Sequence, residues 1–172
     1  MVAIAKEIGP QRWRESFGRY YEEFQPGDVY EHRPGRTISE ADNTWFTLLT
    51  MNTHPLHFDF AFAAKSEFKR PLVNSCLTLS MVVGMSVSDL SQKAIGNLGW
   101  NNICLLAPVF LGDTIYSESE VLSMRESASR PTQGVVTVRT TGKKADGTVF
   151  MSFERTMLLP KRGHAVDDIV DC

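Results

Sequence analysis

The apolar segment of residues 72–90 constrains the fold more than any other part of the chain. Its large apolar side chains recur at spacings of four, one and three residues, at Leu77, Met81, Val82 and Met85. These are helical spacings. Because the segment is apolar nearly all round, it predicts a buried central helix over roughly residues 74–90.

The second half of the chain has the alternating pattern of β-strands. Apolar and polar residues alternate from Val136 to Thr141 and again from Val149 to Thr156. Ala145-Asp146-Gly147 supplies the Asp-Gly signal of a tight turn between the two runs. Residues 95–127 hold two or three further β-rich runs, with Gly112-Asp113 as a turn between strands. Long alternating strands beside one buried helix predict an α+β fold, in which an antiparallel sheet wraps around the helix.

The first half of the chain is predicted to be mostly helical. Residues 1–24 form an N-terminal extension, in which RWRESFGRYYEEF predicts an amphipathic helix. Val29 to Arg33 is a plausible first strand, ended by a turn at Pro34-Gly35. The main domain is expected over residues 25–162, and residues 163–172 read as a loose polar tail.

A helix is predicted to begin after Ser39, which suits the N-cap position. Asp42 completes an acidic variant of the capping box. The helix would end near residues 50–53, because Pro55 disfavours helix at the preceding residue. It is expected to turn three apolar side chains inward, namely Trp45, Leu48 and Leu49. A second short helix is expected from Asp59, which would cap it.

Charge and cysteine content exclude several classes of protein. The net charge of -2 gives no basis for nucleic-acid binding. The longest apolar stretch is broken by polar residues and does not predict a membrane span, and the N-terminus lacks the order of a signal peptide. The cysteines form no CxxC motif: Cys76 and Cys104 read as small core residues, and Cys172 ends the tail. A reducing, cytoplasmic location is therefore expected.

Three motifs resemble those of the MaoC-like dehydratase and (R)-specific enoyl-CoA hydratase family, which has the hot-dog fold. They are NTHPLHFD (residues 52–59), RPLVNSCLT (residues 70–78) and PVFLGDTI (residues 108–115). Within the family, NTHPLHFD and SRPTQG (residues 129–134) are most similar to the mesaconyl-CoA or itaconyl-CoA hydratase type. The resemblance implies an acyl-CoA thioester substrate and no separate cofactor. Since a single sheet also leaves strand edges open, we expect a homodimer joined edge to edge, or a higher homo-oligomer.

The sequence departs from the family pattern at three positions. Asn52 stands where the family has its catalytic Asp, His54 where it has Asn, and Ser75 where it has Gly. The first departure matters most, because an amide can neither give nor take a proton at neutral pH.

The chemistry implied by the resemblance falls on three candidate catalytic residues. His57 can activate water and then protonate the α-carbon, since imidazole titrates near neutral pH. Asn52 would orient the water by hydrogen bonds. The backbone N–H of Ser75, near the helix N-terminus, would stabilise the thioester oxygen. Each residue also has a purely structural interpretation, in which His57 caps a loop, Asn52 bonds its own turn and Ser75 is an N-cap.

Three further residues are candidates for substrate binding. His54 and Asn74 lie in the resembling motifs, and Arg130 would meet a CoA phosphate or a substrate carboxylate, although a plain loop is the alternative. We predict no metal site, because no third ligand joins His54 and His57 in the sequence.

The sequence leaves two alternatives to the hydratase function. Asn52 favours a catalytically silent hot-dog subunit that binds acyl-thioesters. A thioesterase shares the fold, but the helix lacks an acidic residue from Ser75 to Ser88.

Overall fold

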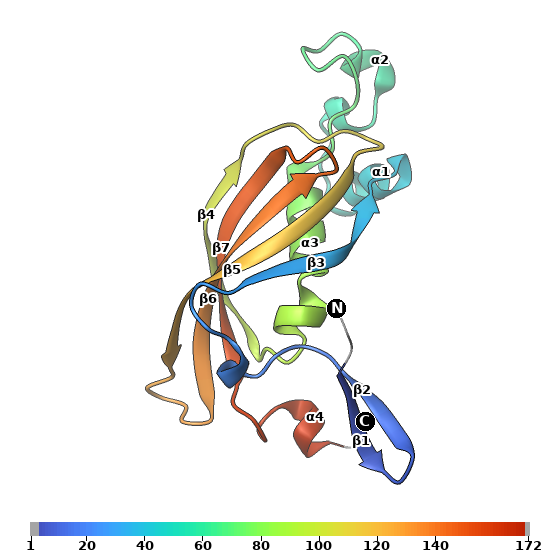
Figure 1. Ribbon diagram of the computed structural model, residues 1–172. Helices are drawn as coiled ribbons and strands as arrows, with labels where there is room; N and C mark the ends of the chain where they lie inside the picture. The colour runs from blue at the N-terminus through green and yellow to red at the C-terminus, as the bar shows by residue number, and fades with distance from the viewer. Residues whose placement is uncertain (1–3, 171–172) are drawn as a thin grey trace.

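A five-stranded antiparallel sheet forms the body of the protein in the computed structural model, which describes residues 4–170 (Figure 1). The strand order is β3-β5-β6-β7-β4. The strands are β3 (Val29–Thr37), β4 (Gly96–Leu105), β5 (Thr114–Glu126), β6 (Gln133–Lys144) and β7 (Val149–Pro160). Helix α3 (Ser75–Met85) packs on one face of this sheet, so the predicted α+β architecture is confirmed.

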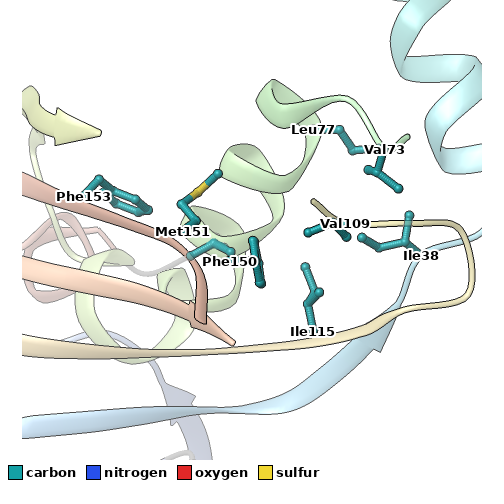
Figure 2. Close-up of a cluster of buried hydrophobic side chains, with 9 residues drawn as sticks. Ile38, Val73, Leu77, Val109, Ile115, Phe150, Met151 and Phe153 are labelled. Carbon is teal, nitrogen blue, oxygen red and sulfur yellow. The ribbon is translucent and has the colours of Figure 1, made fainter. Parts of the chain in front are cut away.

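The main apolar core lies between α3 and the sheet. It joins α3 to β5 and β7 through nine buried side chains, most of them labelled in Figure 2: Ile38, Val73, Leu77, Val82, Val109, Ile115, Phe150, Met151 and Phe153. Burying apolar side chains of this size contributes roughly 1.5–3 kcal/mol each. This burial, rather than local helix propensity, holds α3 in place.

Helix α3 is the predicted buried helix, and its buried side is the one that faces the sheet. Leu77, Thr78 and Val82 face the sheet, whereas Cys76 is exposed. Cys104 on β4 is exposed too, so neither cysteine is the core residue we expected. A single sheet can cover only one side of a helix, and hydrophobicity alone does not specify which apolar positions it covers.

The predicted hairpin between the long strands is confirmed. β6 and β7 pair in one register from Gln133↔Pro160 to Gly142↔Met151, and the register shifts at Lys143↔Val149, next to the turn. Gly147 in the turn has φ +88°, a conformation that glycine adopts without a Cβ penalty. Gly112, in the turn before β5, has φ +89° for the same reason.

The capping box of α1 (Glu40–Leu49) is also confirmed. Ser39 accepts from the Asp42 N–H, and the Asp42 carboxylate accepts from the Ser39 N–H at 2.9 Å. The predicted inward face of this helix was wrong, because three of its large apolar side chains are exposed: Trp45, Leu48 and Leu49. The buried face is polar and consists of Asn43 and Thr47.

Two short helical segments follow α1. They are η2 (Pro55–His57) and α2 (Phe60–Ala63), which is capped by Asp59 as predicted. In Figure 1, α1 and α2 lie at one end of the sheet. The hairpin of β1 (Ile4–Gly9) and β2 (Arg12–Ser16) lies at the other end with α4 (Val166–Ile169).

The N-terminal hairpin corrects the predicted helical extension over residues 1–24. Between residues 4 and 24, the only helical part is the short turn η1 (Tyr21–Glu23). The tail is not loose where the structure describes it: Asp167 accepts from Lys93 Nζ at 2.8 Å, and Asp168 accepts from the Tyr20 hydroxyl at 2.7 Å. Cys172 lies outside the described residues.

The first strand of the sheet is longer than predicted. β3 runs through Pro34-Gly35, where we expected a turn, and its pairing with β5 shifts register between His32 and Arg36. The Tyr116 ring packs where a Cβ on Gly35 would lie, so glycine allows the close approach of the two strands. Within residues 4–170 no helix is long and apolar enough to cross a membrane.

A buried polar cluster lies under the other end of α3. The His32 ring, 2% exposed, bonds the Ser119 hydroxyl at 2.9 Å and lies 3.8 Å from Asp89. Asp89 belongs to η3 (Val87–Ser91), a π-helical turn that continues α3. Arg155, 1% exposed, donates to Ser86 at 2.9 Å. The cluster joins three strands to the end of the helix.

His32 makes stability depend on pH. Burial lowers the pKa of His32 from 6.5 to about 4, because the charged ring would lose its hydration. The negative charge of Asp89 raises the pKa in part, and the positive charge of Arg155 lowers it further. The neutral ring therefore stabilises the fold above pH 6.5, and this stabilisation is lost as pH falls toward 4. The loss is about 3 kcal/mol. Urea unfolding across this range should show a weaker pH dependence for His32→Gln than for the wild type, and equal slopes would contradict the assignment.

Candidate active site

His57 ends η2, in the loop between α1 and α2. Its Nδ1 lies 2.8 Å from the carbonyl oxygen of Leu72. Because a carbonyl only accepts, Nδ1 carries the proton and Nε2 keeps a free lone pair. The ring is half-buried, and the His54 ring lies beside it with centroids 5.9 Å apart. The bond to Leu72 thus holds His57 in the tautomer that a general base needs.

Asn43 is a fully buried residue that connects the segments of this site, and it was missed in the sequence. Its Nδ2 donates to the carbonyl oxygens of His57 (2.7 Å) and Leu72 (3.2 Å), and its Oδ1 accepts from the Asn74 N–H (2.9 Å). One amide therefore ties the His57 loop, the carbonyl that orients the His57 ring and the start of α3 together. The signal that could have revealed it is the polar pair Asn43 and Thr47, spaced by one helical turn on a single face of α1.

The start of α3 faces a pocket. Asn74 caps the helix by accepting from the Cys76 N–H at 2.9 Å, so Asn74 and not Ser75 is the N-cap. Ser75 is the first helical residue, and its N–H has no intrahelical acceptor. The pocket has a volume of about 280 Å³, and its lining is mainly apolar: Phe68, Leu72, Val73, Ser75, Leu105, Leu106, Ala107, Pro108 and Val109. Leu72 therefore has two contacts: it lines the pocket, and its carbonyl orients the His57 ring.

Asn52 has the geometry of a turn residue. Its Oδ1 accepts from the His54 N–H at 3.1 Å, and its own N–H donates to the Thr47 carbonyl at 2.9 Å. His54 is engaged in the same loop, where its Nδ1 accepts from the Leu56 N–H at 3.1 Å. The loop that carries His57 is therefore held by local bonds of both residues.

Arg130 is the one predicted site residue that the fold places elsewhere. It lies in the exposed turn between β5 and β6, at the far end of β5 from α2. At about 3.3 Å per residue, the length of β5 separates the two ends by roughly 40 Å. The other predicted residues lie together, in the His57 loop (Asn52, His54 and His57) and at the start of α3 (Asn74 and Ser75). No cluster of three or more His, Cys, Asp or Glu side chains suited to a metal ion occurs among residues 4–170.

Comparison with known proteins identifies the family. The mesaconyl-CoA hydratase family matches residues 10–170. The mesaconyl-CoA hydratase of Cereibacter sphaeroides is 32% identical over 148 residues, which are 86% of this chain and 43% of that protein. The chain thus spans less than half the length of that relative. The (R)-specific enoyl-CoA hydratase of Aeromonas caviae is 35% identical over 94 residues, 55% of this chain and 69% of that protein.

Solved structures give the same result for the fold. A protein from Archaeoglobus, described as a monoamine oxidase regulatory protein, superposes with a TM-score of 0.75 at 32% identity, covering 84% of this chain and 95% of that chain. A Mycobacterium tuberculosis protein with a double hot-dog fold superposes with a TM-score of 0.78 at 24% identity, covering 87% of this chain and 47% of that chain. The chain therefore has the hot-dog fold and belongs to the mesaconyl-CoA hydratase family of MaoC-like proteins.

Proposed function

We propose that the chain is a hydro-lyase that adds water reversibly to a 2-enoyl-CoA thioester. The observation that carries this proposal is the bond from His57 Nδ1 to the Leu72 carbonyl, which leaves Nε2 free as a base. Leu72 also lines the pocket at the start of α3. The family supports the reaction type, since the relatives are named hydratases and dehydratases.

The reaction needs one residue to move a proton twice. His57 Nε2 takes a proton from water while the oxygen attacks the β-carbon of the enoyl group. Electron density moves to the thioester oxygen, where the Ser75 N–H and the dipole of α3 stabilise it. The α-carbon then takes the proton from Nε2. Protons balance, and the thioester bond stays intact.

The pocket supports a short acyl group as substrate. A volume of about 280 Å³ with an apolar lining suits a few carbons and excludes a long chain. We propose mesaconyl-CoA, a branched dicarboxylic thioester, as the first substrate to test, because the matching family carries that name. Two exposed unpaired thiols, Cys76 and Cys104, support a cytoplasmic location.

Variants of Asn52 distinguish the proposed hydratase from a binding subunit without catalytic activity. If Asn52 orients the attacking water, Asn52→Ala should lose activity, and Asn52→Asp should keep or raise it, since a carboxylate holds the same water and shares the proton transfer. The bond from Asn52 Oδ1 to the His54 N–H favours the silent alternative. Hydration rates of the wild type and both variants on one panel of thioesters decide between them. Activity unchanged in Asn52→Ala would exclude the water-orienting role.

The free edge of β4 supports a homodimer. β4 is the last strand of the sheet, and its exposed side chains include large apolar ones: Leu98, Trp100, Ile103 and Leu105. An edge of this kind invites pairing with a second strand. The Mycobacterium tuberculosis neighbour has a double hot-dog fold, and this chain covers 47% of it. Two copies of this chain would therefore match its size.

A charge on this edge should therefore separate the dimer. Light scattering is expected to give a dimer for the wild type and a monomer for Ile103→Lys, because a lysine at the edge opposes pairing. Trp13→Lys, a similar change at an exposed apolar site on β2, should leave the dimer intact. A wild type that is monomeric at micromolar concentration would contradict the dimer.

The function is tested by incubating the protein with crotonyl-CoA and mesaconyl-CoA while following enoyl absorbance and free thiol. A hydratase removes enoyl absorbance without releasing thiol. Thiol release would indicate a thioesterase, and no change with either substrate would leave the silent subunit.

A further inference from the structure

Arg70 has none of the roles described above, and it stacks on a ring that contacts the pocket-lining residue Phe68. It sits between Phe68 and Leu72, two residues that line the pocket. Its side chain is exposed, and its Cζ lies 3.8 Å from the centroid of the Phe110 ring. This is close stacking of a guanidinium on an aromatic face.

Phe110 is a fixed support for this guanidinium. Its ring is only 9% exposed and contacts the Phe68 ring with centroids 6.2 Å apart. Its backbone forms a bridge with Leu72, and its N–H donates to Asp113 at 3.0 Å. Stacking on a fixed ring limits the motion of the long arginine side chain. The side chain therefore loses less conformational entropy when it binds a ligand.

The charge of Arg70 is not neutralised by the rest of the described chain. Among residues 4–170, no carboxylate lies within 4.0 Å of its guanidinium, in contrast to Lys144, which also lies over the Phe110 ring but is paired with Asp113 at 2.7 Å. Guanidinium groups bind carboxylate and phosphate oxygens through paired hydrogen bonds. An oriented, unpaired guanidinium beside an apolar pocket is therefore suited to an anionic group on a ligand whose apolar part enters the pocket.

We propose that Arg70 is an anion-binding residue for the thioester substrate, taking over the role that the sequence suggested for Arg130. The inference rests on the proposed function for the identity of the ligand. The anion has two possible sources with the same oxygen chemistry, a phosphate of CoA or the second carboxylate of a dicarboxylic acyl group. An exposed guanidinium stacked on Phe110 can bind either group.

Variants of Arg70 and three thioesters separate these sources. The substrates are crotonyl-CoA, mesaconyl-CoA and crotonyl-pantetheine, which lacks the CoA phosphates. Arg70→Met is expected to lower kcat/KM roughly 10- to 100-fold on whichever substrates carry the bound anion, the range for a hydrogen bond to a charged group. A loss on mesaconyl-CoA alone assigns the acyl carboxylate. A loss on both CoA thioesters, with crotonyl-pantetheine unchanged, assigns a CoA phosphate.

Two control variants complete the experiment. Arg70→Lys keeps the charge without the planar stacking and should recover part of the loss. Arg125→Met removes an exposed arginine at the far end of β5 and should change none of the rates. Equal rates for Arg70→Met and the wild type on all three substrates would overturn the proposal. If the wild type hydrates none of them, the same comparison of thioester affinities by calorimetry still tests Arg70, while the proposed function fails.

Discussion

Replacing His57 with Ala should lower the turnover of enoyl-CoA hydration by about two to four orders of magnitude, the usual contribution of a general acid–base group. The reason is geometric. The Leu72 carbonyl fixes the proton on Nδ1, so Nε2 keeps the lone pair that the proposed mechanism requires. The loss should appear in kcat, because the ring acts on proton transfer in the transition state and not on binding of the thioester.

The His57 variant needs a matched histidine and a measure of folding. His164 is exposed in the segment before α4, and His164→Ala should keep the wild-type rate. Thermal unfolding should show that His57→Ala is folded. Near-normal turnover of folded His57→Ala on every thioester that the wild type hydrates would contradict its catalytic assignment.

Replacing Asn43 with Ala should lower kcat/KM on the order of 10²-fold, although Asn43 has no direct role in the chemistry. Displacing a catalytic group by about an ångström has an effect of this size. The substitution removes bonds to His57 and Leu72 and leaves the Asn74 N–H without its acceptor. An unsatisfied buried donor should also lower the free energy of unfolding by about 1–3 kcal/mol.

A conservative variant and a neighbour distinguish positioning from loss of stability. Asn43→Asp can still accept from the Asn74 N–H but cannot donate to the two carbonyls, so it should show a large activity defect. Thr47→Val removes a buried hydroxyl one turn along α1 that bonds only the Thr44 carbonyl, at 2.8 Å, and should affect stability more than activity. If all three variants lost activity in proportion to stability, the positioning role of Asn43 would be wrong.

Local signals predicted several elements because each depends on neighbours in the chain. The Ser39–Asp42 capping box, the Asp59 cap and the Asp146-Gly147 turn are made by residues within a few positions of one another. The buried helix followed from its apolar spacing. The proposal for His57 came from a family resemblance that lies in one continuous motif, residues 52–59, so it also depended on neighbours in the chain.

Contacts between distant parts of the chain explain most of the errors. Residues 12–24 have a helical pattern of aromatic and charged side chains, yet residues 12–16 pair with β1 in a hairpin. The tail is held by Lys93 and Tyr20, far away in sequence. Periodicity in α1 identified an apolar face at Trp45 but could not show that the polar face at Asn43 packs inward.

The roles proposed for Asn43 and Arg70 depend on contacts between segments that are far apart in the sequence. Asn43 meets His57, Leu72 and Asn74 only because α1, the His57 loop and the start of α3 converge at one end of the sheet. Arg70 reaches Phe110 only because Leu72 and Phe110 pair as an isolated bridge. Arg130, in contrast, was predicted from residue type alone, and the length of β5 separates it from the site.

Hydration of crotonyl-CoA in water labelled with oxygen-18 tests the central claim most directly. The hydratase predicts that the label enters the β-hydroxyl of an intact 3-hydroxyacyl-CoA, at a rate that His57→Ala lowers by about two to four orders of magnitude. Label found instead in a free carboxylic acid, with release of CoA, would contradict the account.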